Sequence, residues 1–215
     1  MQAARLRLLK WSALVLSLVV LSIVIYFAYG PGKVNSVTFE PRGDAFVMRG
    51  VITNSTPRDL AEAMEEFPGL TRIIMQDVPG SVDDVANLEA GRLIHRAGLT
   101  TIIPANGMVA SGGTDFFLAG RERIVQVGAC IGVHAWSGGL GMKPENLSRS
   151  HEAHRMYLDY YAAIGINPAF YWYTLEAAPA TEIHWMTDGE MRDYAVATVY
   201  ETAQISRVSR CDDRL

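Results

Sequence analysis

Residues 110–120 read ASGGTDFFLAG, and this stretch decides the fold that we expect for the chain. Apolar residues precede it, so the pattern predicts a strand that ends before Ser111 and a helix from Ser111 to Ala119. The Ser111 hydroxyl would lie near the positive end of the helix dipole, and Gly112 and Gly113 would leave room for a substrate backbone. Such a serine can attack a carbonyl carbon when a base is near, but the stretch alone is more typical of an ordinary helix N-cap.

A candidate base comes from the next apolar run. Cys130 to Val133 predicts a strand, and His134 ends it just before the polar, glycine-rich residues 137–141. His134 should therefore lie at the edge of a sheet beside open space. A lone histidine is more often structural, whereas a histidine paired with Ser111 would act as a general base.

Two turns offer backbone amides for an oxyanion. The segment Pro79-Gly80-Ser81 predicts a turn between a strand and a helix, and its amides at Gly80 and Ser81, together with that of Gly112, form the predicted oxyanion hole. The same segment is typical of any strand-to-helix turn in an α/β protein. If the turn needs a positive φ at Ser81, the serine strains it.

Strands and helices alternate along the chain, which indicates a mainly parallel α/β sheet. Expected strands are 37–39, 45–52, 71–78, 100–103, 124–127, 130–133 and 182–186. Expected helices are 57–66, 81–96, 111–119, 145–164, 168–176 and 188–194. The first of these helices has a cap in residues 54–56 and Pro57 in its first turn.

Four segments in order resemble the superfamily of ClpP-like serine proteases and crotonases, in particular the proteolytic subunit of the Clp protease. They are VPGSV at 78–82, ASGGTDFFLAG at 110–120, IGVH at 131–134 and WMTDGE at 185–190. The resemblance implies an α/β fold built as a ClpP/crotonase-like spiral of β-β-α units, with Ser111 as nucleophile and His134 as base. Aromatic runs at 156–161 and 170–173 fall where the family places a projecting handle, which implies a homo-oligomer.

The third member of the triad departs from this family's pattern. The position of the family's catalytic aspartate falls near Pro179, where no acid stands. Glu176 or Glu182 could serve after a shift of a few residues, and Glu182 is the prediction that we carry forward. Lys143 offers a different base, as in serine-lysine relatives of the superfamily. The site is therefore a dyad, a repaired triad or a disabled enzyme.

The N-terminal region predicts a membrane anchor. No charged residue occurs from Trp11 to Tyr29, and a helix of this length spans about 28 Å. Basic residues before it place residues 1–10 in the cytoplasm. A linker over 30–36, a ClpP-like domain over 37–205 and a polar tail over 206–215 follow, and the domain is then extracytoplasmic, or periplasmic in a bacterium. A cleaved signal peptide is the rival interpretation.

Composition narrows the remaining possibilities. The chain has 215 residues and a net charge of −4 with no basic run, which argues against a nucleic-acid partner. Two cysteines are too few for a disulfide scaffold, and Cys130 is predicted to lie in the core. His151 and His154 could share a metal, but without a third ligand we expect two solvated histidines and no metal site. No phosphate loop or dinucleotide motif is present, so no cofactor is expected.

These observations predict a membrane-anchored, extracytoplasmic serine peptidase that acts on peptides or proteins. One alternative is a catalytically impaired relative that binds a peptide or partner protein in the same groove. Another is a crotonase-like acyl hydrolase or isomerase, against which the expected location argues, because coenzyme A thioesters are not expected there.

Overall fold

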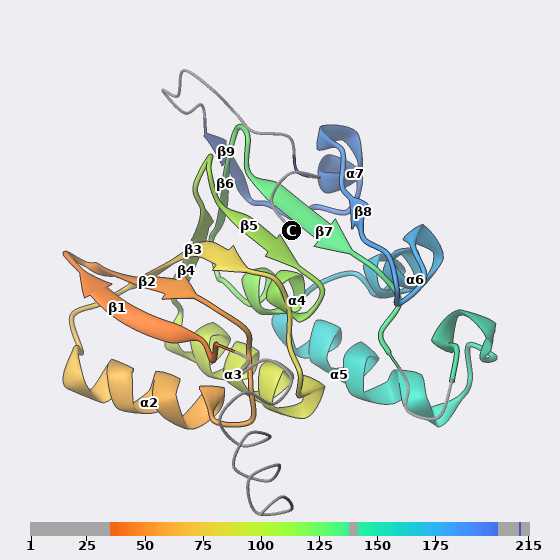
Figure 1. The fold of residues 1–215 in the computed structure, drawn as a ribbon, viewed down its shortest axis with the longest axis horizontal. Helices are drawn as coiled ribbons and strands as arrows, with labels where there is room; N and C mark the ends of the chain where they lie inside the picture. Colours follow the sequence, from red (N-terminus) through yellow and green to blue (C-terminus); the bar gives the residue numbers. More distant parts are fainter. Residues whose placement is uncertain (1–34, 138–141, 202–210, 212–215) are drawn as a thin grey trace, which may run out of the picture. The chain divides into compact units, whose positions relative to one another are not determined.

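The computed structural model describes residues 35–137, 142–201 and 211, and Figure 1 shows their arrangement. The compact unit that holds the elements below begins at Ser36. Within the described residues no helix has the length and apolar character needed to cross a membrane. The predicted anchor at 11–29 lies outside those residues, as does most of the predicted linker and of the polar tail.

Strands and helices alternate along this unit, as the sequence predicts. The strands are β1 (Thr38–Arg42), β2 (Ala45–Arg49), β3 (Arg72–Val78), β4 (Thr100–Ile103), β5 (Met108–Ala110), β6 (Arg123–Gln126), β7 (Cys130–Val133), β8 (His184–Trp185) and β9 (Val199–Glu201). The helices are α2 (Thr56–Glu66), α3 (Asp84–Ala97), α4 (Gly112–Leu118), α5 (Arg155–Ile164), α6 (Pro168–Ala177) and α7 (Asp188–Asp193), with short 3-10 turns η2 (Pro144–Asn146) and η3 (Glu152–His154).

The sheet divides at β3. Strand β2 pairs with one edge of β3, while β4 pairs with the first half of the other edge and β5 with its last two residues. One branch continues from β4 to β6 and β9, and the other from β5 to β7 and β8. All pairings in the described sheet are parallel except β1 with β2 and β7 with β8. The predicted mainly parallel α/β sheet is therefore confirmed, in a curled, divided form.

The core lies between the sheet and the helices α3, α4 and α5. Helix α3 packs against α2, α4 and α5, and α4 packs against β4, β5 and β7 (Figure 1). Strand β3 and helix α4 supply side chains with no exposed surface, namely Ile73, Met75, Val78, Phe116, Phe117 and Leu118. Burying a side chain of this size stabilises the fold by about 1.5–3 kcal/mol, so α4 is fixed firmly to the sheet.

The start of α3 differs from the prediction. The helix begins at Asp84, not at Ser81, because the Asp83 carboxylate accepts a hydrogen bond from the Ala86 amide (3.0 Å) and caps it. Ser81 and Val82 therefore belong to a turn. This turn extends the parallel ladder to residue 52, since Ile52 N–H donates to the Gly80 carbonyl and Val82 N–H donates to the Ile52 carbonyl, both at 2.9 Å.

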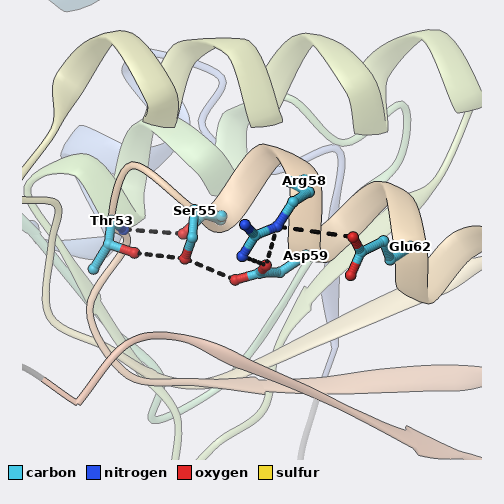
Figure 2. A network of polar contacts seen from close by, with 6 residues as sticks. Thr53, Ser55, Arg58, Asp59 and Glu62 are labelled. Atoms are coloured by element: carbon cyan, nitrogen blue, oxygen red, sulfur yellow. Dashed lines mark hydrogen bonds and ion pairs between the residues drawn. The ribbon is translucent and has the colours of Figure 1, made fainter.

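Figure 2 shows how the start of α2 is held. Ser55 occupies the N-cap position but makes no side-chain capping bond. Its hydroxyl donates instead to the Asp59 carboxylate (2.7 Å), which also pairs with Arg58 at 2.7 Å (Figure 2). Arg58 in turn lies 3.8 Å from Glu62. Pro57 lies in the first turn as predicted, and these side-chain bonds link the residue before α2 to the first two turns of the helix.

The predicted helix over 145–164 is wrong in its first half. Residues 144–146 and 152–154 form separate 3-10 turns, and α5 begins only at Arg155. Local polar bonds compete with a helix in this stretch. Ser148 and Ser150 hydroxyls bond to each other at 2.9 Å, and the His151 ring nitrogen Nδ1 accepts from the Ala153 amide at 3.2 Å.

A disulfide joins Cys130 of β7 to Cys211, with a Cα–Cα distance of 5.6 Å. Cys130 is buried, which confirms its predicted place in the core. The pairing itself was missed, because two cysteines 81 residues apart carry no spacing signal. The bond ties the end of the described chain to the strand that leads to His134.

Candidate active site

Ser111 lies on a strained turn between β5 and α4. Its φ of 53° and ψ of −128° are rare for a residue with a side chain, and such strain costs on the order of 1–3 kcal/mol. Backbone bonds hold the turn: Ser111 N–H donates to the Gly132 carbonyl (3.1 Å), and Thr114 N–H donates to the Ser111 carbonyl (2.8 Å). Strained strand-to-helix turns of this kind present a serine hydroxyl to a substrate.

Close packing around the turn explains its glycines. A Cβ at Gly113 would lie 2.2 Å from the Val78 carbonyl oxygen, so only glycine lets α4 approach β3 this closely. A Cβ at Gly80 would lie 3.3 Å from the Ser111 Cβ, and φ at Gly80 is 153°. Gly80 thus brings the turn before α3 directly against Ser111.

The predicted oxyanion amides lie next to one another. A Cβ at Gly112 would lie 2.3 Å from the Ser81 hydroxyl oxygen, so the two residues touch. The Gly112 amide is in the first turn of α4, where N–H groups lack an acceptor within the helix. In the bonds between this turn and residue 52 the amides of Ile52 and Val82 donate, and within the described residues no acceptor is bonded to the Ser81 amide. Ser81 has no positive φ, because the turn places that conformation at Gly80, so the serine does not strain it.

A cavity of about 380 Å³ opens beside this turn. Ser81, Ser111, Gly112 and His134 all line it. The structure therefore brings together the predicted nucleophile, the predicted base and two of the three predicted oxyanion residues. The third, Gly80, lies against Ser111 but is not among the residues that line the cavity.

His134 lies half-buried just past the end of β7. Burial lowers the pKa of His134, while a backbone interaction at Ala135 and the charge of Asp84 act in the other direction. The lowered pKa favours the neutral ring, which can accept a proton. Its buried Nδ1 has no hydrogen-bond partner in the part of the chain that the structure describes. No described hydrogen bond joins His134 to Ser111 either.

The other candidates lie elsewhere. Glu176 is exposed, lies outside the cavity lining and pairs with Arg149 at 3.3 Å. Glu182 is exposed, does not line the cavity, and its one described bond is from its own amide to the Pro179 carbonyl (3.0 Å). Lys143 is also exposed and outside the cavity lining. None of the three contacts His134 or Ser111 among the described interactions.

Sequence reasoning missed the opposite wall of the cavity. Tyrosines and two aspartates line it, namely Asp84, Asp115, Tyr157, Tyr161 and Tyr171. The Asp84 carboxylate accepts bonds from the Ser81 hydroxyl and the Tyr157 hydroxyl, both at 2.6 Å. The Asp115 carboxylate accepts one from the Tyr161 hydroxyl. The one available signal was Asp115, an acid inside the apolar helix that follows Ser111.

His154 was expected to be solvated, and this is wrong. It is fully buried, its Nδ1 lies 2.6 Å from the Tyr171 hydroxyl, and its ring meets Trp172 edge to face at 4.9 Å. Burial, with the nearby His151, lowers the pKa of His154. Within the described residues no three metal-binding side chains are grouped closely enough to hold an ion.

No family model and no curated protein matches the chain. Similar solved structures do exist. A variant of the 1510-N membrane-bound stomatin-specific protease is 18% identical, with a TM-score of 0.49, and the match covers 75% of this chain and 79% of that one. A second variant of that protease, in complex with a substrate peptide, is 19% identical over 74% and 75%, with a TM-score of 0.47.

A third similar structure is a ClpP1 variant from Listeria monocytogenes. It is 15% identical, with a TM-score of 0.50, and the match covers 75% of this chain and 92% of that one. At this identity the likeness establishes the fold. The chain has a ClpP-like fold, as its sequence motifs predict.

Proposed function

We propose that this protein is a serine peptidase of the ClpP-like type, with Ser111 as nucleophile and His134 as general base. One observation carries the proposal. A single cavity brings together a serine on a strained turn, a histidine held neutral by burial, and the backbone amides of Ser81 and Gly112. These are the parts that acyl transfer from a peptide bond requires.

In the proposed reaction the Ser111 oxygen attacks the carbonyl carbon of the scissile bond while His134 takes the hydroxyl proton. The amides of Gly112 and Ser81 donate to the oxyanion, an interaction worth about 3–4 kcal/mol per donor in such sites. His134 then gives the proton to the leaving amine. Water, deprotonated by the same histidine, releases the acyl group from Ser111.

We propose that the base works without a carboxylate bonded to it. Glu182, predicted to orient the histidine, lies away from the cavity, and the Nδ1 of His134 has no described partner. Asp84 lines the same cavity and favours the protonated ring through its charge. It would stabilise the imidazolium formed during attack, although it cannot fix the ring as a bonded acid does.

We further propose that the domain lies outside the cytoplasm on an N-terminal anchor formed by residues 11–29. The Cys130–Cys211 disulfide supports this location, because such bonds persist mainly in oxidising compartments. A homo-oligomer is proposed from the family resemblance. Light scattering on the detergent-solubilised full chain would measure its size.

The test is hydrolysis of a quenched fluorescent peptide library by the full chain in detergent. We expect turnover that Ser111→Ala reduces by at least about 10³-fold, because the nucleophile supplies most of the chemistry. Ser148→Ala is the matched control, since this exposed serine lies outside the cavity and should keep full activity. Equal turnover by wild type and Ser111→Ala would overturn the proposal.

A second candidate function is peptide binding without cleavage. The Nδ1 of His134, buried without a described partner, favours it, because an unoriented imidazole is a poor base. This alternative predicts no turnover by the wild type. It also predicts peptide affinity that survives alanine at both Ser111 and His134.

A further inference from the structure

The cavity beside Ser111 is lined by two carboxyl groups and by no lysine or arginine. The carboxyl groups belong to Asp84 and Asp115. Among the described ion pairs none includes either aspartate. Both are half-buried, and carboxyl groups withdrawn from water are ordinarily paired with a cation or protonated, so this part of the cavity can accept a cation.

Both carboxylates are held in place and keep bonding capacity. Asp84 is fixed by the Ser81 and Tyr157 hydroxyls, one on each oxygen. Asp115 is fixed through Oδ1 by the Tyr161 hydroxyl, and Tyr160 donates to its carbonyl at 2.7 Å. No described donor reaches the Oδ2 of Asp115. Because a carboxylate accepts about four hydrogen bonds, further donors can bind at both.

The charges also disfavour one another. Burial, together with the charge of Asp84, raises the pKa of Asp115 to about 7, although its Tyr161 bond acts in the other direction. Part of this shift comes from the charge of Asp84, and a cation that enters the cavity would offset that charge and favour the ionised form of Asp115. Tyr157, Tyr161 and Tyr171 line the same part of the cavity. Because Tyr157 stacks between Trp136 and Tyr171, these residues offer ring edges and hydroxyl groups beside which the methylene stem of a long basic side chain can pack.

We propose that this cavity binds a lysine or arginine side chain of the substrate, directly before the scissile bond, with Asp84 and Asp115 holding its charged head. The proposal rests on the peptidase function above and names its substrate class. A cavity of about 380 Å³ suits this role, since it falls at the lower end of the roughly 300–1,000 Å³ typical of small-ligand sites.

The test compares tripeptide aminocoumarin substrates that end in arginine, in citrulline or in leucine. Citrulline has nearly the shape of arginine without its charge. We expect the wild-type full chain to cleave the arginine substrate at least about tenfold faster in kcat/KM than the citrulline one, because a charge-assisted hydrogen bond is worth about that ratio or more. Asp115→Asn should remove most of this preference.

Asp159→Asn is the matched control. This exposed aspartate on α5 makes the same charge change outside the cavity and should leave the ratio unchanged. Fluorophosphonate labelling of Ser111 should persist in Asp115→Asn, which separates altered specificity from a collapsed site. Equal rates for arginine and citrulline substrates, or preference for leucine, would overturn the basic pocket while leaving the peptidase intact.

If the wild type cleaves none of these substrates, binding measurements test the proposed pocket instead. Calorimetry on Ser111→Ala would compare N-acetyl-arginine methylamide with its citrulline counterpart. Tighter binding of the arginine compound, lost in Asp115→Asn, would support the pocket even though the peptidase proposal had failed. Equal affinities would overturn the pocket.

Discussion

The two walls of the cavity are built in different ways. The sheet wall, which carries Ser111, Gly112 and His134, depends on backbone geometry: a strained turn, free amides and the end of β7. The helix wall depends on side chains from distant parts of the sequence. Its bonds from Tyr157 to Asp84 and from Tyr161 to Asp115 span 73 and 46 residues. The residues proposed for the chemistry thus come from local segments, and those proposed for substrate selection depend on long-range packing.

The largest expected effect distinguishes His134 from Glu182, the acid that the sequence predicts as its partner. His134→Ala should lower kcat/KM by about 10³-fold or more, because it removes the general base. Glu182→Ala should change it less than about threefold, because this exposed glutamate lies outside the cavity. Steady-state peptide hydrolysis measures both. A comparable loss in the two variants would make Glu182 the orienting acid after all.

A second prediction concerns the close packing behind the sheet wall. Gly113→Ala would place a methyl group 2.2 Å from the Val78 carbonyl oxygen, so the free energy of unfolding should fall by about 3 kcal/mol or more. Gly69→Ala, where a Cβ meets open space, should change it by less than about 0.5 kcal/mol. Denaturant unfolding compares them. Similar stabilities would mean that α4 does not pack as tightly as described.

The disulfide provides a third test, because it anchors the strand that precedes His134. Replacing Cys130 and Cys211 by alanine should lower the free energy of unfolding by about 2–3 kcal/mol, since the crosslink closes a long loop. Reduction of the wild type should destabilise it by a similar amount. A thermal transition that reduction leaves in place would show that the crosslink contributes nothing to this wall.

The smallest expected effect comes from the helix wall. The pKa of Asp115 is raised to about 7 in the folded chain, so its ionisation destabilises the fold progressively from about pH 4 to 7 and by a constant amount above. Asp115→Asn removes that cost. This difference in pKa between the unfolded and folded chain would correspond to about 4 kcal/mol, and the partial exposure of Asp115 to solvent reduces it, so we expect a gain of about 1–2 kcal/mol at pH 8 and none below pH 4.

Unfolding at pH 4, 6 and 8 would measure this difference. Asp159→Asn again serves as the exposed control and should show no such trend. A gain at pH 8 that persists unchanged at pH 4 would mean that Asp115 is not ionised in the cavity, and the contrast in charge between the two walls would disappear.

The difference between the two walls also explains which features of the molecule could be predicted from the sequence. The parallel α/β sheet and the turn at Ser111 were predictable, because strand periodicity and the Ala-Ser-Gly-Gly pattern are local. The N-cap at Asp83 makes α3 begin later than predicted. The positive φ of this turn lies at Gly80 and not at Ser81, and this position depends on the three-dimensional fold.

The helix wall could not be predicted from one sequence. Asp84 lies in the first turn of α3, where an acid is ordinary at the positive end of a helix, and Tyr157 and Tyr161 are buried aromatic residues. Neither feature indicates a cavity in the sequence. Their role at the cavity depends on how α5 packs on α3. The same holds for His154, which sits at helical spacing from His151 yet lies among Trp136, Tyr171 and Trp172.

The most direct test of the central claim is to locate the residue that reacts with a fluorophosphonate. Three serines line the cavity, Ser81, Ser111 and Ser137, so peptide mapping by mass spectrometry distinguishes them. We predict phosphonylation at Ser111 alone, lost in His134→Ala and retained in Ser148→Ala. Modification at Ser81 or Ser137, or no modification of the folded wild type, would contradict an activated nucleophile at the Ser111 turn.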